Sequence, residues 1–322
     1  MRRKRKIRHY SGIGGQAVLE GVMMKNNDMY AVAVRKPDGE IAVEVDEYHG
    51  PAYGSKLKSI PFIRGVFVFL DSLILGLKSL NYSSSFYEET KEKPTKLDEG
   101  IDQVSQGHED TFLMVLTTII SFAFAIAIFM IAPYALSEVI GKYVRNESLV
   151  AIIEGVLRIV IFILYILLIS LMKDIRRLFQ YHGAEHKCIN CLERGRPLTV
   201  KNVRRSSRLH KRCGSSFILF VMLISIILFF FIRVDSYALR IVIRLLLVPV
   251  IAGISYEIIR LAGKTDFFLV KIVSAPGLWL QRLTTKEPDD DMIEVAIKSV
   301  ESVFDWKEFL KDSFGYEFEE EE

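Results

Sequence analysis

The chain alternates between long apolar stretches and segments in which charge is concentrated. Four stretches are close to the ~20 residues that a helix needs to cross a bilayer, and each carries few or no charged side chains: 112–132, 149–172, 215–232 and 237–261. The first ends at Pro133, and the last is the weakest, because charged residues lie around its apolar centre. The pattern predicts a mainly α-helical, polytopic membrane protein with four transmembrane helices.

Two other patterns precede these stretches. Residues 29–46 alternate apolar and polar side chains around the turn at 37–39, which predicts a small N-terminal β-hairpin. Residues 60–82 are apolar except for three charged residues that share one thin stripe of a helix: Arg64, Asp71 and Lys78. This amphipathic helix is expected to lie in the membrane interface, to be re-entrant, or to pack against other spans.

The C-terminal segment is predicted to be cytoplasmic and helical. An amphipathic stretch surrounds Trp279, and an aspartate-rich segment after Pro288 leads into a helix with one apolar face. The chain ends in an acidic tail. The predicted organisation has seven parts: an N-terminal region with the hairpin (1–58), the amphipathic or re-entrant helix (59–82), a polar linker (83–111), transmembrane helices one and two (112–172), a basic loop (173–214), transmembrane helices three and four (215–263) and the C-terminal segment (264–322).

The distribution of Lys and Arg predicts how these parts are oriented. Residues 2–8 hold six Lys or Arg and no acid, and the loop 173–214 holds twelve against three Asp or Glu. Because Lys and Arg are retained on the cytoplasmic side, both segments are expected to face the cytoplasm. Four spans place both segments on the cytoplasmic side, whereas a fifth span at 60–82 would place them on opposite sides of the membrane. The sequence predicts a multi-pass protein of the bacterial cytoplasmic membrane with both termini in the cytoplasm.

The basic loop also holds the residues best suited to chemistry. His182-Gly-Ala-Glu185-His186 is the reversed form of a zinc-protease helix motif. On a helix that continues the second span, the two histidines lie one turn apart and can bind one divalent metal, expected to be Zn²⁺. Glu185 would act as a general base beside it. Cys213 or His210 would complete the ligand set.

Two other interpretations of this loop stay open. Cys188-x2-Cys191 followed by His210-x2-Cys213 has the spacing of a closed zinc ribbon, whose ion is structural. Alternatively, the histidines are hydrogen-bonded packing residues and the cysteines are small buried apolar side chains. The surrounding basic residues agree with the predicted topology and with attraction to the lipid bilayer. No sequence-specific nucleic-acid binding is expected, because no aromatic residues are interleaved with them.

Four ionisable residues fall inside the predicted spans: Glu154, Arg158, Arg240 and Arg244. Charged side chains at bilayer depth are costly and usually pair with one another. With a rise of ~1.5 Å per residue, the depths of the acid and the arginines overlap. We therefore predict an intramembrane ion pair of Glu154 with Arg240 or Arg244, with Arg158 one turn away. The alternative is that these side chains extend to the outer headgroups.

Several longer blocks resemble the YqhQ-like family of bacterial membrane proteins, which shares a domain of unknown function. The blocks are residues 14–24, 181–187, 212–217 and 276–288. They span nearly the whole chain, and the resemblance implies a metal-dependent enzyme without an assigned reaction. It points to His182, Glu185 and His186, with Glu20 and Cys213 as further candidates.

Two functions from different classes are consistent with these features. The first is a cytoplasm-facing, membrane-embedded metalloenzyme, expected to be a hydrolase. The second is a non-catalytic factor for membrane-protein assembly or translocation, in which zinc only maintains the shape of the loop. Such a factor would bind a membrane-protein complex or the translocation machinery. An open coordination position on the metal distinguishes the two functions.

Overall fold

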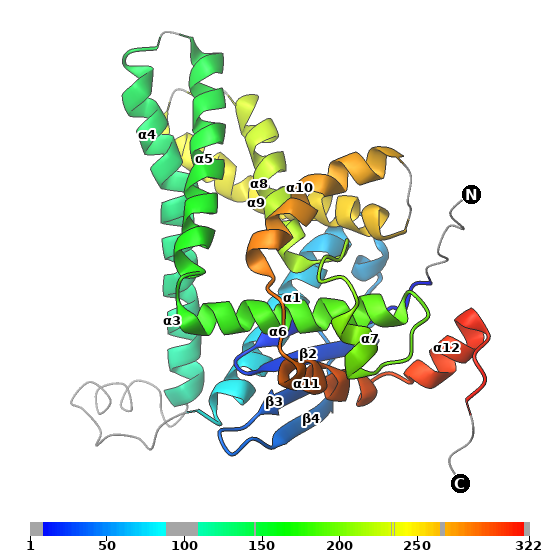
Figure 1. Ribbon diagram of the computed structural model, residues 1–322. Helices are drawn as coiled ribbons and strands as arrows, with labels where there is room; N and C mark the ends of the chain where they lie inside the picture. The colour runs from blue at the N-terminus through cyan, green and yellow to red at the C-terminus, as the bar shows by residue number, and fades with distance from the viewer. Residues whose placement is uncertain are drawn as a thin grey trace. The chain divides into compact units, whose positions relative to one another are not determined.

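The computed structural model describes residues 9–87, 109–144, 146–232, 234, 236–264 and 268–318 (Figure 1). The chain divides into two compact units. The first unit contains Met1–Tyr87, Leu167–Ile224 and Leu247–Glu322, and the second contains Glu88–Ile166 and Ser225–Leu246. The basic residues 2–8, most of the predicted linker and the last four residues of the acidic tail lie outside the described residues.

The first unit contains a four-stranded antiparallel sheet, which confirms the predicted β-hairpin and extends it. The strands follow one another in the order β1 (Gly14–Val18), β2 (Gly21–Asn26), β3 (Met29–Arg35) and β4 (Ile41–Glu47). The hairpin is formed by β3 and β4, with Val32 opposite Glu44. The sequence pattern does not predict β1 and β2, because glycines in β1 and a continuous apolar run in β2 hide the two-residue alternation.

Helices cover both faces of this sheet. The helices that lie wholly in the first unit are η1 (Lys56–Ser59), α1 (Ile63–Ser84), α6 (Lys173–Leu192), α7 (Val200–Arg204), α10 (Phe268–Thr284), α11 (Asp290–Glu301) and α12 (Trp306–Phe314). Val22 of β2 packs in one core with α6 and α11, whereas its neighbour Met23 packs in another with Leu75 of α1. Because neighbouring strand residues point to opposite faces, a strand buried on both sides is apolar throughout. Figure 1 shows α6 and α11 lying together at the sheet.

The amphipathic helix expected at 60–82 is α1, and one of its faces packs against the sheet. Each charged side chain of its stripe has an ion-pair partner: Arg64 with Glu257, Asp71 with Lys58, and Lys78 with Asp46. Its other face carries exposed apolar side chains, among them Phe69 and Ile74. By length and composition, α1 is not among the helices that could cross a membrane.

The structure also confirms the helix predicted after Pro288. This helix is α11, which begins after Asp289. Its first turn contains Asp290 and Asp291, whose negative charges interact favourably with the positive end of the helix dipole. The predicted apolar face is buried, since Ile293 and Val300 are inaccessible to solvent in the core with α6 and the sheet. This face therefore fixes the C-terminal segment to the rest of the first unit.

The second unit consists of apolar helices. It contains α3 (Glu109–Ile126), η2 (Ala127–Ile131), α4 (Ala132–Gly141), most of α5 (Glu147–Ile169), and parts of α8 (Gly214–Phe230) and α9 (Tyr237–Lys264). The prediction that the first apolar helix ends at Pro133 is wrong. A proline ring clashes with the carbonyl four residues earlier, and here a π-helical segment, η2, precedes Pro133. Wider π-helical turns accommodate such a residue, so the helix continues to Gly141.

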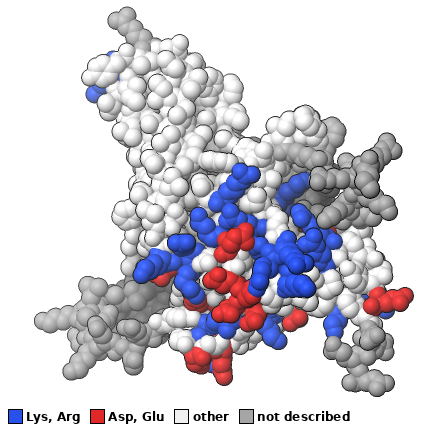
Figure 2. All heavy atoms as spheres, viewed as in Figure 1, with Lys and Arg blue, Asp and Glu red and all other residues white. Residues whose placement is uncertain are grey.

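Three helical segments of the described residues are long and apolar enough to cross a membrane: Val115–Gly141, Glu147–Ile169 and Ala238–Gly263. They correspond to the first, second and fourth predicted spans. The third predicted span corresponds to α8, an apolar helix of 17 residues that is shorter than these three segments. In Figure 2, the surface formed by α4 and α5 carries almost no charge, whereas Lys and Arg gather over the region of α6.

Candidate metal centre

The two histidines of the motif lie on one face of α6. The rings of His182 and His186 meet edge to face, with centroids 4.4 Å apart. The expectation that this helix continues the second span is wrong, because α5 ends at Ile169 and Met172 is extended before α6 begins. The histidine pair is therefore held on a separate helix, whose orientation is set by its packing against the sheet and α11.

Gly183, inside the motif, makes room for a second segment of chain. A Cβ atom there would lie 2.0 Å from the backbone oxygen of Lys286. The Lys286 N–H donates a hydrogen bond to the carbonyl of Phe179 at 2.8 Å, which holds the crossing segment against α6. The glycine costs the helix about 1 kcal/mol relative to alanine, but it lets the chain after α10 reach the histidines.

Cys213 brings its thiol to the two imidazoles from just before α8. Its Sγ atom lies 3.2 Å from Nε2 of His182, and one ligand atom from each of His182, His186 and Cys213 lies within 4.8 Å of the others. Among the residues that the structure describes, this is the one group of three His, Cys, Asp or Glu side chains with such spacing. Zinc bonds of about 2.0–2.3 Å place tetrahedral ligands roughly 3.3–3.8 Å apart. The 3.2 Å contact is slightly shorter than this spacing and the 4.8 Å limit is longer, so small shifts of the side chains would suit the set to zinc.

Backbone carbonyls orient both rings. Nδ1 of His182 lies 2.9 Å from the carbonyl oxygen of Thr284, and Nδ1 of His186 lies 2.7 Å from that of Arg208. A carbonyl can only accept, so each Nδ1 carries the proton and donates it. In the neutral imidazole, each Nε2 then keeps its lone pair, as metal-binding histidines require. The donor set of two imidazoles and one thiol thus fits zinc in both type and tautomer.

Three polar side chains fix the loop that carries Arg208 and Cys213. Lys187 of α6 donates to two loop carbonyls at 2.8 and 3.0 Å, and Asn190 donates to two more at 2.8 and 3.1 Å. Gln281 of α10 accepts from the N–H of His210 and donates to its carbonyl, both at 2.8 Å. These bonds connect α6, the loop and α10 into one support for the centre.

Charge within the centre favours a thiolate. Burial by itself opposes ionisation of Cys213, but the neighbouring His182 and His186 hold the pKa of this thiol well below its usual value. Burial likewise disfavours a charged His182, yet the Cys213 sulfur raises the pKa of that imidazole to about 9. Thiolates are the form of cysteine that binds metals and attacks electrophiles. The Cys213 thiolate can therefore act as a metal ligand or as a nucleophile.

Glu185 lies beside the centre, between α6 and β1. It is buried, and burial raises the pKa of its carboxyl group above the usual value, while His186 and His182 oppose the rise. A Cβ atom at Gly15 would lie 3.1 Å from Cγ of Glu185 and 2.5 Å from the backbone oxygen of Met23. The glycine of β1 thus leaves space for this carboxyl group. A carboxyl with a raised pKa is suited to general acid–base work.

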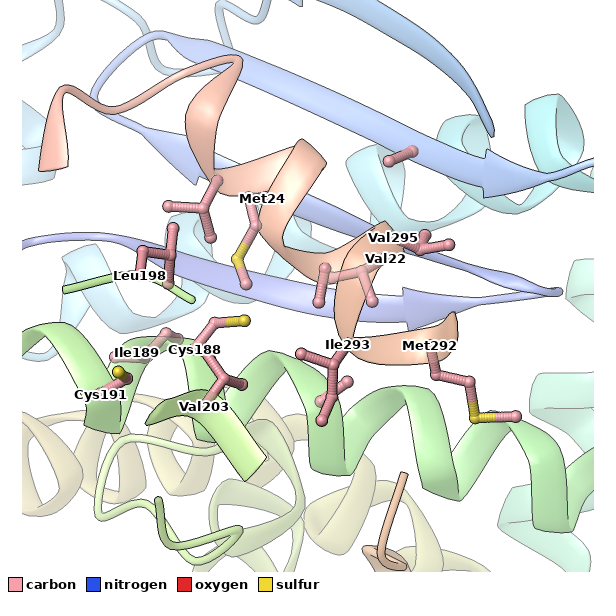
Figure 3. Close-up of a cluster of buried hydrophobic side chains, with 14 of the residues drawn as sticks. Val22, Met24, Cys188, Ile189, Cys191, Leu198, Val203, Met292, Ile293 and Val295 are labelled. Carbon is pink, nitrogen blue, oxygen red and sulfur yellow. The ribbon is translucent and has the colours of Figure 1, made fainter. Parts of the chain in front are cut away.

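The other proposed ligands do not join this group. Cys188 and Cys191 are fully buried in the apolar core formed by α6, α11 and the sheet (Figure 3). Burial raises the pKa of Cys191 to about 11 and that of Cys188 well above its usual value, so both remain thiols. Nε2 of His210 lies 3.4 Å from the Glu193 carboxylate. The structure therefore does not bring the four residues of the proposed ribbon together.

Glu20 is also outside the ligand group. It lies in the β1–β2 turn with a φ of 50°, and its carboxylate forms an ion pair with Arg177 and accepts a hydrogen bond from the Tyr181 hydroxyl at 3.2 Å. Left-handed backbone is uncommon for residues other than glycine. Glu20 thus connects this turn to the start of α6, upstream of the histidines.

Three buried ionisable residues of the apolar helices, Glu154, Arg158 and Arg244, lie together in the second unit. The buried Glu154 carboxylate pairs with Arg158 at 2.8 Å and with Arg244 at 2.8 Å. Arg158 also donates to Ser225 at 2.8 Å. The structure places Arg240 elsewhere, in a more exposed pair with Glu138. Two buried guanidinium groups therefore share one buried carboxylate.

Several supporting groups could not be recognised from sequence patterns. The carbonyls of Thr284 and Arg208 carry no side-chain signal, and Gln281 matches no ligand motif. The one sequence feature near them is the block 276–288, which contains Gln281 and Thr284. The role of this block follows from its contacts with α6, which no local sequence pattern predicts.

These features define a mainly helical protein with membrane-length helices and a candidate His–His–Cys metal centre beside a small sheet. Residues 60–306 match the family described as "Protein of unknown function (DUF1385)". The chain is 38% identical over 294 residues to "Uncharacterized protein YqhQ" of Bacillus subtilis (strain 168), with coverage of 89% of this chain and 90% of that protein. It belongs to this family, the YqhQ-like proteins. No solved structure matches the chain significantly.

Proposed function

We propose that the protein is a zinc-dependent hydrolase of the bacterial cytoplasmic membrane, with its metal centre on the cytoplasmic side. The observation that carries this proposal is the convergence of His182, His186 and Cys213, with both Nδ1 atoms already bound to carbonyls. Three protein ligands leave one position of tetrahedral zinc for water or substrate, which is the pattern of catalytic sites. When bound, zinc supplies a Lewis acid that polarises substrate and acidifies water.

The chain's own residues supply the remaining roles. His182 and His186 donate their Nε2 lone pairs, and the carbonyls of Thr284 and Arg208 keep those atoms directed at the centre. Glu185 takes and returns the proton of the attacking water, because burial brings the pKa of its carboxyl group closer to the working pH. Membrane attachment comes from the three apolar helices of sufficient length and from α8.

The 3.2 Å contact between Cys213 and His182 also favours a second candidate. A thiolate beside an imidazole, whose other nitrogen is held by a carbonyl, has the arrangement of an activated cysteine nucleophile. Nucleophilic attack by such a cysteine needs no metal. The metal content of the purified protein therefore separates the two candidates.

The test uses full-length protein purified in mild detergent. About one zinc ion per chain is expected by elemental analysis, and it should be lost in the double variant His182→Ala/His186→Ala. Glu185→Gln should retain zinc and expression but fail to complement a deletion strain, since loss of a general base typically costs ~10²–10⁴ in rate. The exposed Glu294→Gln is the matched control.

The possible results lead to different conclusions. Chains purified without zinc, but inactivated by Cys213→Ser, would favour the cysteine nucleophile. Full complementation by Glu185→Gln, with zinc still bound, would contradict the hydrolase. It would favour a non-catalytic assembly or translocation factor whose zinc is structural.

A further inference from the structure

A large cavity adjoins the metal centre in the first unit. Its volume is 770 Å³, and Cys213 is part of its lining. Binding sites for small ligands usually enclose about 300–1,000 Å³. Because Cys213 belongs both to this lining and to the candidate metal centre, a molecule bound in the cavity would have one end near that centre.

The walls of the cavity are apolar over most of their length. They are formed by side chains of α1, α8 and α9: Val68, Phe69, Leu73, Phe217, Ile218 and Ile259. The rings of Phe69 and Phe217 stack with centroids 5.6 Å apart. Phe69 is 37% exposed and Ile218 51%, so apolar side chains extend to the rim. Exposed apolar surface of this kind marks a binding groove or a membrane contact.

The end near Cys213 is basic. Lys211 and Arg212 directly precede Cys213 in this lining, and Arg260 also contributes to it. Glu193 is the one lining carboxylate, and Arg260 also pairs with Glu257 at 3.8 Å. Arg212 is held in place by its ion pair with Glu193 and by the ring of Tyr10, which lies 3.9 Å from the guanidinium carbon. Guanidinium groups match the geometry of phosphate oxygens. The excess positive charge at this end suits a ligand with an anionic head.

We propose that this cavity binds a membrane lipid with a phosphate headgroup, and that such lipids are the substrate class of the metal centre. The hydrocarbon chain would lie along α1, α8 and α9, and the headgroup beside Arg212 and Cys213. This assignment rests on the proposed hydrolase. Hydrolysis would break one P–O ester bond, with water supplying the new oxygen on phosphorus and a proton to the released alcohol.

Charge complementarity and the position of the walls select this ligand. An uncharged hydrocarbon would leave the basic end unmatched, and a cationic amphiphile would be repelled by it. Inorganic phosphate alone would leave the apolar walls without a partner. The helices α8 and α9 contribute both to this wall and to the apolar segments expected in the bilayer, so a lipid can enter from its own environment.

Native mass spectrometry of the delipidated, full-length protein tests the proposal. Dioleoyl phosphatidic acid should bind wild-type protein roughly tenfold more tightly than chain-matched phosphatidylcholine, whose phosphate is neutralised by choline. Leu73→Trp, which fills the cavity, should weaken binding by roughly tenfold, or about 1.4 kcal/mol. The neighbouring Ile74→Trp should bind like wild type, because Ile74 is exposed and does not line the cavity.

A variant that removes a charge tests the basic end of the cavity without the change in side-chain packing that Leu73→Trp introduces. Arg260→Gln should weaken the binding of phosphatidic acid, whereas Lys298→Gln on the exposed face of α11 should not. Displacement of the lipid by millimolar inorganic phosphate would identify free phosphate as the ligand and overturn the proposal. Equal affinities for phosphatidylcholine, or equal effects of Leu73→Trp and Ile74→Trp, would also overturn it.

Zinc analysis of the same samples separates this proposal from the proposed function. Cavity variants that lose lipid but retain zinc would support the lipid site. Wild-type protein that retains zinc but does not bind phosphatidic acid would overturn the lipid site alone.

Discussion

Both histidines of the candidate centre are oriented by main-chain oxygens rather than by carboxylate side chains. The bonds from His182 to Thr284 and from His186 to Arg208 therefore depend on the path of the backbone. Substitution of the Thr284 side chain leaves the acceptor in place, whereas displacement of the segment removes it. The residues that decide the geometry are thus those that allow the close crossing, Gly183 above all.

The three cysteines are expected to respond differently to the same substitution. Cys213→Ser should lose bound zinc, because a serine hydroxyl is not ionised as the thiol of a zinc ligand is. Cys188→Ser should retain zinc but reduce stability by about 1–3 kcal/mol, since it buries a hydroxyl in an apolar core. Elemental analysis and thermal unfolding of both variants check this. Equal zinc contents would exclude Cys213 as a ligand.

Gly183→Ala is expected to damage the centre without removing any ligand. The new Cβ would clash with the Lys286 carbonyl and push the crossing segment away, at a cost of about 1–3 kcal/mol. Zinc occupancy should fall with stability, because the Thr284 carbonyl moves with that segment. Gly141→Ala is the control, since a Cβ there meets neighbours at ordinary contact distances. Wild-type stability of Gly183→Ala would show that the crossing is not tight.

At the scale of elements, the parts predicted from sequence are those with a local signal. The alternation at 29–46 predicted the hairpin, and the four-residue spacing of His182 and His186 predicted that they share one face of a helix. The approach of Cys213 to His182 joins residues 31 apart and has no local pattern. Cys188 illustrates the converse: its spacing resembles a ribbon, but burial between α6 and α11 decides its role. Motif spacing cannot distinguish these cases, because core packing is set by distant elements.

The ion cluster of the second unit should contribute strongly to the stability of its helices. Glu154→Gln leaves the buried Arg158 and Arg244 without their carboxylate and is expected to cost about 3–5 kcal/mol. Arg240→Gln should cost less than about 1 kcal/mol, because its partner Glu138 is half exposed. Thermal unfolding in detergent measures both effects.

A double-mutant cycle tests the contact directly. The double variant Glu154→Gln/Arg244→Gln should lose less stability than the sum of the losses in the two single variants. The double variant removes both charges of the pair, whereas each single variant leaves one of them buried without its partner. Strict additivity would mean that the two side chains do not interact.

At the scale of the whole molecule, the proposed topology can be tested with the native cysteines in place, since all three are buried. Lys201→Cys, on α7 in the basic loop, should resist a membrane-impermeant thiol reagent in intact cells. Asn146→Cys, between the first two apolar helices, should react. Disrupted cells provide the control, in which both positions should be labelled. Reaction of Lys201→Cys in intact cells would reverse the orientation.

The bond between His182 and the carbonyl of Thr284 spans 102 residues and has a consequence for biosynthesis. A ribosome adding about 5–20 residues per second makes Thr284 roughly 5–20 s after His182. During that interval the nascent chain already contains both histidines and, later, Cys213, but no carbonyl to orient the first ring. Under the proposed function, zinc would reach its final geometry only after α10 has been synthesised and the segment that follows it has packed over Gly183. A chain that ends before Thr284 is therefore expected to lack the carbonyl that orients His182 in the proposed centre.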